Sequence, residues 1–442
     1  MKKIIFPLAL LATGFVLLFL YIDSDQAIQS DRSGQGVEVQ TNQANQTDDT
    51  SAPQSAADVA DASDSEETGF TEAYWNYTVA TKGDAPHDWS ALEKNLKPEA
   101  CAQCHVEQFN AWKKSLHAHA YSPGMIGQFP GMGHTEGNDA CLKCHAPLEE
   151  QKYSSRQDML ESLSAKLKQP EGFSQEAVLG ESNLPLRHSG VSCAACHVRG
   201  WQRFGPPQRD TGAIGKIDGA VHSGFTGIKD FERSNFCASC HQFPQYMAIN
   251  GKPLENTVKE WQESRFASEG VECQSCHMPD RKHEFKGIHD PEMTRKGLDF
   301  KLVQKENGAL LTIESKWIGH AFPTYVTPKV VVLAEAVDGS GKSLRKWQWE
   351  IIRNVYFDGS WKERSDTRLM PGETRAFEAS DAPAETDQIR YEIKVIPDYF
   401  YKGVYQGLLH GGLEGDAERL IRQAVEHADS NDYTLYKGVV EL

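Results

Sequence analysis

The chain has 442 residues, and its 62 acidic residues outnumber its 46 basic residues, so the formal net charge at pH 7 is -16. This acidity disfavours nucleic-acid binding, because a phosphate backbone repels such a surface. An acidic surface suits docking to a basic protein, but it also serves solubility, and charge alone does not decide between the two.

The chain opens with Met1-Lys2-Lys3 and an apolar run over residues 4–22, which is about the length needed to cross a bilayer. A cleaved signal peptide usually has a shorter apolar core followed by an Ala-x-Ala-like site, and residues 23–30 contain no good site of that kind. The lysines before the run place the rest of the chain outside the cytoplasm. We therefore predict a transmembrane anchor over residues 1–22 rather than a cleaved signal, with the bulk of the chain in the periplasm.

Residues 23–69 are rich in Ser, Gln, Asp, Ala and Thr, and Arg32 is their only basic residue. With so few large apolar side chains, this segment cannot offset the entropy cost of ordering. We predict a disordered acidic linker without a binding role, which lets the next domain reach away from the inner membrane.

All ten cysteines of the chain fall into five Cys-x-x-Cys-His motifs. The motifs are Cys101-Cys104-His105, Cys141-Cys144-His145, Cys193-Cys196-His197, Cys237-Cys240-His241 and Cys273-Cys276-His277. This pattern is typical of c-type haem attachment, in which two thiols bond the porphyrin and the histidine becomes the proximal iron ligand. Zinc sites also use paired cysteines, but they need no histidine directly after each pair. We therefore predict five covalent haem c (heme c) groups and no structural disulfide.

Residues 70–297 are the predicted pentahaem domain. The motifs follow one another so closely that little room is left for an apolar core, and the porphyrins are expected to take its place. Helices are predicted over residues 107–120, 154–169 and 255–267, and a Gly-rich loop over residues 206–227. We expect a helical, loop-rich domain with little sheet.

After residue 297 the sequence changes to short runs rich in Val, Ile, Tyr and Thr, separated by turn sequences such as Pro371-Gly372. The predicted strands cover residues 300–305, 309–315, 329–337, 347–357, 373–378 and 388–397. Regular short strands indicate an antiparallel sandwich, so residues 298–442 are predicted to form an all-β, sandwich-like domain with a terminal helix over residues 416–427. This multi-domain arrangement leaves the second domain without a haem of its own.

Several local sequences carry a family resemblance. They are Trp112-x-x-Ser115-x-His117-Ala118, Gly190-Val191-Ser192-Cys193, the fifth motif with Met278-Pro279, His283 and His289 after it, and Gly319-His320-Ala321-Phe322-Pro323-Thr324. They resemble the multihaem cytochrome c-554 family, within the wider group of pentahaem nitrite reductase and hydroxylamine oxidoreductase. The resemblance covers about residues 95–400 and implies a haem-packed helical domain with haems in close pairs, but it does not fix a substrate.

The chain also departs from its relatives. Pentahaem nitrite reductases typically bind their catalytic haem through Cys-x-x-Cys-Lys, whereas all five motifs here end in histidine. Some members of that group use histidine at that place, so the missing lysine weakens the nitrite reductase interpretation but does not eliminate it. Hydroxylamine oxidoreductases carry eight haems, which this chain lacks.

A haem that only relays electrons usually has both axial positions filled, whereas a catalytic haem keeps one open. The predicted distal ligands are His117, His119, His222, His283 and His289. The first two are expected to point to opposite sides of the predicted helix 107–120. His222 lies in the Gly-rich loop, and the family resemblance supports the last two. Three roles stay open for His320: a haem ligand, a hydrogen-bond partner of a propionate, or a buried structural histidine.

The remaining histidines have less specific surroundings. His134 and His188 lie near motifs and are expected at the surface or behind the ligands. His87, His410 and His427 are interpreted as ordinary histidines. Two arginines after the third motif, Arg199 and Arg203, are expected to pair with propionates.

The favoured function is an electron relay from a membrane donor, such as a quinol-linked protein, to a periplasmic or extracellular acceptor. The expected partners are redox proteins and the membrane, with no nucleic acid. The alternative is an enzyme that reduces a small nitrogen or sulfur compound, such as nitrite, hydroxylamine or a tetrathionate-like anion, at one five-coordinate haem. An assembly role, in which the β domain docks a partner, is disfavoured by the haem content. Whether the protein is an enzyme depends on whether every iron has both axial positions filled or one iron keeps a position open.

Overall fold

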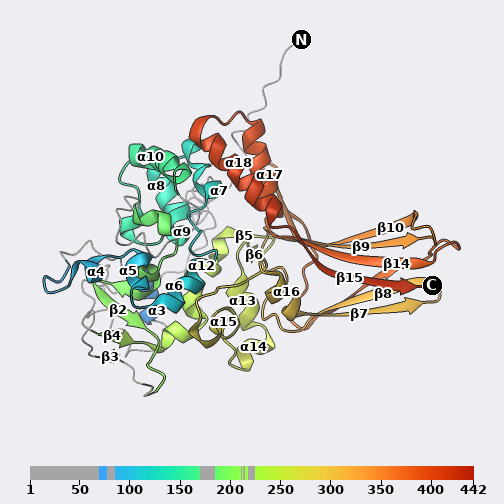
Figure 1. Cartoon of the computed structure of the whole chain (residues 1–442), viewed down its shortest axis with the longest axis horizontal. Helices are drawn as coiled ribbons and strands as arrows, with labels where there is room; N and C mark the ends of the chain where they lie inside the picture. Colours follow the sequence, from blue (N-terminus) through green and yellow to red (C-terminus); the bar gives the residue numbers. More distant parts are fainter. Residues whose placement is uncertain (1–68, 77–84, 170–184, 211, 213–214, 218–223) are drawn as a thin grey trace, which may run out of the picture.

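The computed structural model describes residues 69–76, 85–169, 185–210, 212, 215–217 and 224–442. The predicted anchor, nearly all of the predicted linker and His222 lie outside this part of the chain. Within it, no helix is both long and apolar enough to span a bilayer. The described residues combine helices with several β-sheets (Figure 1). We refer to residues 69–297 as the haem-motif part and to residues 298–442 as the β-rich part.

Short helices dominate the haem-motif part. They are α3 Gly69–Asn76, α4 Ala91–Lys94, α5 Pro98–Ala102, α6 Val106–Trp112, α7 Pro123–Ile126, α8 His134–Gly137, α9 Lys143–His145, α10 Arg156–Leu167, α11 Cys193–His197, α12 Asn235–His241, α13 Thr257–Gln262, α14 Arg265–Ser268, α15 Cys273–His277 and α16 Pro291–Gly297. Their buried apolar residues form several small clusters instead of one continuous core. This pattern agrees with a domain in which a cofactor takes the place of the core.

Two small sheets lie among these helices. The first has the strand order β1-β2-β4-β3 and the second is a hairpin of β5 and β6. Their bounds are β1 Val198–Arg199, β2 Gln202–Gly205, β3 Gly215–Ile217, β4 Phe225–Gly227, β5 Ala248–Ile249 and β6 Lys252–Pro253. The predicted loop over residues 206–227 therefore contains two short strands, while the expectation of little sheet holds for the described haem-motif part.

Two of the three predicted helices are interrupted for the same reason. Helix α6 ends at Trp112 and α13 ends shortly after Trp261, although the predictions continued to residues 120 and 267. In each case a serine three residues after the tryptophan, Ser115 or Ser264, donates its hydroxyl to the tryptophan carbonyl at 2.7 Å. Such side-chain bonds compete with helical backbone bonds and bend or end the helix. The third prediction, over residues 154–169, is confirmed by α10.

The β-rich part contains two larger antiparallel sheets, with strand orders β10-β9-β14-β15 and β13-β8-β7, and the hairpin β11-β12. Their bounds are β7 Leu298–Lys305, β8 Gly308–Ser315, β9 Lys329–Val337, β10 Ser343–Ile351, β11 Arg353–Phe357, β12 Trp361–Asp366, β13 Thr374–Ala379, β14 Gln388–Ile396 and β15 Tyr433–Glu441. Alternate residues of β8 and β14 are buried, as the two-residue period of a strand requires. One apolar cluster, which includes Leu311, Val332 and Ile393, joins the two sheets.

Most strand predictions are confirmed, with two differences. The predicted strand 347–357 divides into β10 and β11 at Ile352, and β12 and β15 were not predicted. β15 is the edge strand beside β14, and its burial alternates only weakly, which explains why its sequence gives a weak signal.

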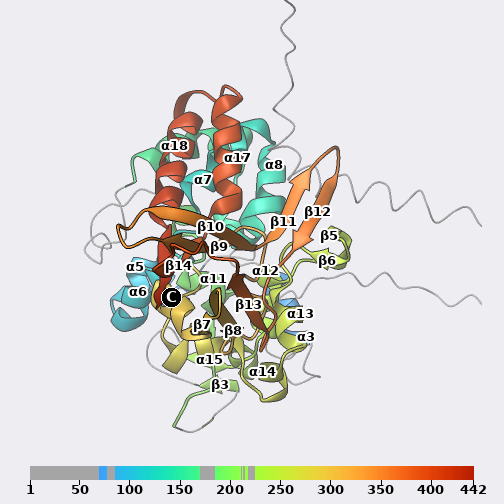
Figure 2. The same cartoon turned by 90° about the vertical axis from the view of Figure 1, so that its right-hand side faces the viewer.

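The C-terminal helix prediction was incomplete. The structure has a hairpin of two helices, α17 Tyr399–His410 and α18 Gly415–Ser430, and β15 follows it, so the predicted helix is not terminal. Figures 1 and 2 show this hairpin beside α7 of the haem-motif part, away from the tips of the long strands. Leu420 of α18 is fully buried in a cluster with Ile126 and Met159. The hairpin thus packs on the haem-motif part and not on the two larger sheets.

Two buried arginines of the β-rich part bind the haem-motif part. Arg353 donates to the backbone carbonyls of Ile249 and Lys252 at 2.9 and 2.7 Å. Arg368 donates to the Glu260 carboxylate at 2.9 Å, and the side chains of this pair are only 2% and 3% exposed. The two parts are therefore joined by buried polar contacts, and the predicted domain boundaries stay a prediction.

Candidate haem-binding site

One large cavity runs through the haem-motif part. Its volume is about 3180 Å³, and all ten motif cysteines and all five motif histidines line it. A pocket for one small ligand usually holds about 300–1000 Å³. The residues present therefore fit several porphyrins in one connected space. Four of the predicted distal histidines, His117, His119, His283 and His289, line the same cavity, as does His320.

Three of the motifs lie in short helices at the cavity wall. The third and fifth motifs are the whole of α11 and α15, and the fourth motif ends α12. In a helical turn, residues three apart share a face. The two thiols of a motif therefore face the same side, and the histidine that follows them lies beside it. All ten cysteines are free thiols, as covalent attachment to a porphyrin requires.

Three motif histidines face a second imidazole across the cavity. The ring centroids are 6.0 Å apart for His197 and His283, 6.2 Å for His241 and His117, and 6.3 Å for His277 and His320. An imidazole nitrogen binds a metal at about 2.0 Å. Since that nitrogen lies about 1 Å from its ring centre, two imidazoles on opposite sides of one iron have centroids about 6 Å apart. The three spacings fit irons with two histidine ligands.

The hydrogen bonds of four of these rings engage Nδ1 and leave Nε2 available to bind a metal. Nδ1 lies 2.8 Å from the Phe204 carbonyl in His197 and 2.6 Å from the Lys286 carbonyl in His277. Nδ1 of His283 and of His320 also faces a backbone carbonyl, at 2.9 and 3.0 Å. A metal-binding histidine commonly donates its second ring N–H in this way, which fixes the ring orientation. In all four rings Nε2 is the nitrogen left to face the iron.

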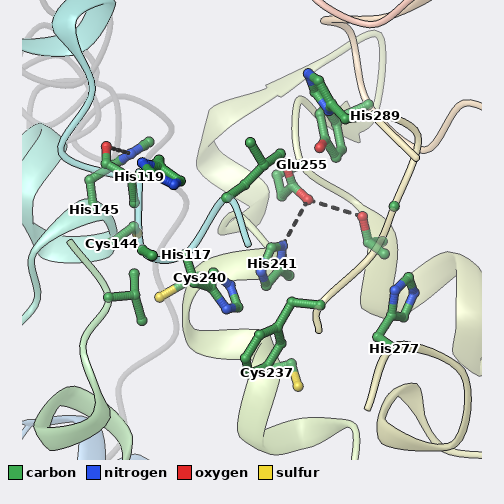
Figure 3. Close-up of a pocket in the computed structure, with 18 of the residues that line it drawn as sticks. His117, His119, Cys144, His145, Cys237, Cys240, His241, Glu255, His277 and His289 are labelled. Atoms are coloured by element: carbon green, nitrogen blue, oxygen red, sulfur yellow. Dashed lines mark hydrogen bonds and ion pairs between the residues drawn. The ribbon is translucent and has the colours of Figure 1, made fainter. Parts of the chain in front are cut away.

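His241 differs from the histidines of the second, third and fifth motifs. Its Nδ1 lies 3.5 Å from Oε1 of Glu255, as Figure 3 shows, instead of facing a backbone carbonyl. Burial lowers the pKa of His241, but the nearby carboxylate raises it, and the net direction is upward. By contrast, burial lowers the pKa of His145, His197 and His277. The fourth motif therefore has a different electrostatic environment.

His117 reaches the fourth motif from a turn, not from a helix. Its carbonyl accepts the N–H of Val191 at 2.9 Å, while the Trp112 indole donates to the Val191 carbonyl at 2.8 Å. Gly190 has a φ of 57°, and a Cβ there would lie 2.5 Å from the His117 carbonyl oxygen. Only glycine allows this close approach without strain. The predicted helical geometry of His117 and His119 was therefore wrong, although His117 lies opposite a motif histidine.

The same arrangement occurs a second time. The Trp261 indole donates to the Val271 carbonyl at 2.8 Å, and the Val271 N–H donates to the carbonyl of Phe266 at 2.8 Å. The tryptophan and valine are 79 residues apart in the first copy and 10 in the second. Each valine lies two residues before a motif. The haem-motif part thus contains an internal structural repeat, in which Phe266 stands where the first copy has His117.

In two of the predicted ligands, Nε2 contacts another residue of the chain. His289 directs Nε2 to Oδ1 of Asp398 at 3.1 Å, and His119 directs Nε2 to the Lys113 carbonyl at 3.1 Å. His119 lies beside His145 of the second motif, whose Nδ1 is 2.9 Å from the Ala120 carbonyl (Figure 3). Their roles as ligands stay predictions that this geometry does not favour.

His320 is the residue that the sequence left open and that the structure brings to a motif. Glu260 accepts the N–H of Ala321 at 3.1 Å and the hydroxyl of Thr324 at 3.0 Å, and so holds the segment. The His277 and His320 rings are nearly parallel, at 14°. The local signal was the sequence Gly319-His320-Ala321-Phe322-Pro323-Thr324, but it does not reveal which motif lies opposite.

The other candidates lie outside these pairs. His188 is 2% exposed and contacts Gln169 at 3.2 Å, so of the two expected places the surface is excluded, and a place behind the ligands stays a prediction. His427, interpreted as ordinary, lines the cavity from α18. Arg199 and Arg203 donate to backbone carbonyls and lie over the aromatic rings of Tyr74 and Trp89, and their pairing with propionates stays a prediction.

The motifs lie next to one another in a definite order. The thiols of Cys101 and Cys193 interact, and helices α5 and α11 that carry them are in contact. The fourth motif is adjacent to three others. Its helix α12 contacts α9 of the second motif, Phe236 at its start packs near Cys196 of the third, and Ser234 before it binds the backbone of Cys273 in the fifth. The fourth motif is therefore the junction of the set.

Residues 100–168, which hold the first two motifs, match the family model described as cytochrome c554 and c-prime. The predicted resemblance to the multihaem cytochromes c is confirmed. Among solved structures, a penta-heme cytochrome c552 from Thermochromatium tepidum has a similar fold, with a TM-score of 0.54 and 18% sequence identity over 80% of this chain and 100% of that chain. A comparison with curated protein sequences finds no match.

Haem c is accordingly the cofactor that these motifs fit. The number of haems follows only from the number of motifs in this chain, and it stays a prediction.

Proposed function

We propose that the protein is a membrane-anchored, periplasmic five-haem cytochrome c that relays electrons between a membrane donor and a periplasmic or extracellular acceptor. Haem c supplies one-electron oxidation and reduction when it is bound. The chain would hold the haems close together, supply the histidines that occupy their irons and exclude water from them.

The observation that carries the proposal is the combination of one shared cavity with paired histidines. Three of the five motif histidines face a second imidazole at the spacing of two ligands on one iron. Two histidine ligands keep iron geometry the same in both oxidation states, which suits electron transfer and leaves no position for a substrate. In this proposal His320, in addition to His117 and His283, is a distal ligand.

The order of the motifs supports a route from the first motif to the fifth, with the second motif as a branch at the fourth. The first motif contacts the third, the third lies near the fourth, and the fourth contacts the fifth. Cys104 of the first motif and Cys276 of the fifth are the two exposed cysteines. Electron transfer falls steeply with distance, so exposed ends are where partner proteins would exchange electrons. We propose redox proteins, with a quinol-linked membrane protein on the donor side, as the partners.

Haem content and spin state test the proposal together. The purified full-length protein should give five haems per chain by pyridine haemochrome assay and mass spectrometry. Low-temperature EPR of the oxidised protein should show low-spin signals only. A high-spin haem that binds nitrite or hydroxylamine in the wild type would overturn the relay proposal in favour of the reductase alternative.

Membrane anchoring needs a separate test. We expect residues 1–22 to remain on the mature protein and to hold it in the membrane fraction. Replacing residues 1–24 by a cleavable signal sequence should release a soluble protein with the same haem content. A native N-terminus near residue 28 or later would show that the segment is a cleaved signal.

A further inference from the structure

The fourth motif is distinguished by a carboxylate beside its proximal histidine. Nδ1 of His241 lies 3.5 Å from Oε1 of Glu255, and the Glu255 side chain is only 14% exposed. In the second, third and fifth motifs, the corresponding ring nitrogen faces a backbone carbonyl at 2.9, 2.8 and 2.6 Å. A backbone carbonyl carries a partial charge, whereas a carboxylate carries a full one.

The position of Glu255 is held by residues on both sides of the boundary between the two parts. Thr257 donates its hydroxyl to Oε1 of Glu255 at 3.0 Å, and this hydroxyl lies 2.7 Å from that of Thr324 in the β-rich part. The backbone carbonyl of Glu255 accepts the N–H of Phe243 at 2.8 Å, so the main chain is fixed too. Figure 3 shows the Glu255 carboxylate directed toward His241.

A negative charge at this place has a predictable effect on an iron bound to His241. The carboxylate makes the imidazole more basic and thus a stronger electron donor. A stronger donor and a nearby negative charge both stabilise ferric iron relative to ferrous iron, which lowers the midpoint potential. A separation of 3.5 Å is long for a hydrogen bond, so charge accounts for most of the effect. The Glu255 side chain is only 14% exposed, and a charge shielded from water is screened less than one in bulk water.

We propose that Glu255 is a positioning residue that orients His241 and makes the haem of the fourth motif the one with the lowest potential among the second to fifth. This haem is also the junction, because its motif adjoins the second, third and fifth. Among these four haems, transfer of an electron onto the haem of the fourth motif is therefore the least favourable step. The proposal rests on haem attachment at the fourth motif and holds for a relay and for a reductase alike.

The test compares three variants of the full-length, haem-loaded protein by redox potentiometry and EPR. E255Q keeps the shape of the side chain but removes its charge, so the lowest of the midpoint potentials of the haems at the second to fifth motifs should rise. The low-spin EPR signal of one haem should change its g values, with the others unchanged. E255D keeps the charge but is one methylene shorter, so its potential should lie between those of E255Q and the wild type.

Glu272 provides a matched control. Its carboxylate also lines the cavity beside the fourth and fifth motifs, but it accepts the backbone N–H of Ser234 at 2.7 Å and contacts no motif histidine. E272Q removes the same charge and should shift the potentials less, with no change in g values. The proposal is overturned if E255Q leaves the lowest potential unchanged, or if E272Q shifts the same haem equally. Haem content measured on each variant separates these outcomes from loss of the cofactor. Loss of haem in E255Q but not in E255D would also overturn the proposal, because Glu255 would then be needed to retain the haem and not only to lower its potential.

Discussion

Which nitrogen of an imidazole is available decides whether a histidine binds an iron. His283 and His320 use Nδ1 for a backbone carbonyl and leave Nε2 toward a motif histidine, whereas His289 uses Nε2 for Asp398. The motif residues follow directly from the sequence, because their spacing is local. The distal set does not, since the family resemblance supported His283 and His289 equally and only the fold reveals which nitrogen faces the cavity.

Replacing His320 by Ala should open one iron. The variant should show a new high-spin EPR signal and should bind cyanide or carbon monoxide, because the fifth motif loses the imidazole opposite His277. His289→Ala is the control, since this histidine lines the same cavity but is bound to Asp398. A high-spin signal in His289→Ala and none in His320→Ala would reverse the assignment.

At the scale of elements, the repeated Trp-x-x-Ser turn explains the errors in helix length. The apolar pattern continues past Trp112 and Trp261, so periodicity alone predicts longer helices. The serine hydroxyl then satisfies the carbonyl that the next helical turn would have used. The strands were easier to predict, because burial on one face imposes a two-residue period that the sequence carries directly.

The two tryptophans of the repeat should contribute alike to stability. Trp112→Phe and Trp261→Phe each remove an indole N–H and leave a valine carbonyl without that donor, which costs about 1 kcal/mol. Denaturant unfolding followed by tryptophan-independent haem absorbance measures the change. Trp317→Phe is the control at an exposed position, where the expected change is within about 0.5 kcal/mol. Unequal losses from the first two would argue against equivalent roles.

The α17–α18 hairpin should stabilise the haem-motif part. Leu420→Ala removes a fully buried side chain from a cluster shared with α7 and α10, and should lower the free energy of unfolding by about 2–5 kcal/mol. Arg422→Ala, two residues later on the exposed face of α18, should cost less than about 0.5 kcal/mol. Equal losses in the two variants would contradict the packing described for this helix.

At the scale of the whole molecule, the two parts depend on each other more than the sequence suggests. Composition changes sharply near residue 297, and it correctly predicts where α16 ends and β7 begins. It does not predict that the β-rich part sends α17, α18 and His320 back to the cavity, because such contacts depend on the folded arrangement of distant segments. Buried arginines reinforce the same contact.

The Arg368–Glu260 pair should be important for both stability and haem ligation. Arg368→Met leaves a buried carboxylate without its cation and should cost about 3–5 kcal/mol. Since Glu260 holds the Ala321 N–H, part of the fifth haem should also become high-spin in this variant. Lys362→Met, which breaks an exposed pair with Asp358, should change neither measurement. Normal stability in Arg368→Met would contradict a structural role for the pair.

The origin of His320 in the β-rich part also imposes an order on biosynthesis. On the proposed periplasmic route, Cys273 and Cys276 would leave the translocation channel before residue 320 does, so attachment of the porphyrin would precede the arrival of the proposed distal ligand. An iron at the fifth motif would then lack its second histidine until the segment 319–324 folds onto Glu260. On this proposal, maturation of the fifth centre would end with a folding step, and an immature or truncated chain would expose a reactive iron that the finished protein conceals.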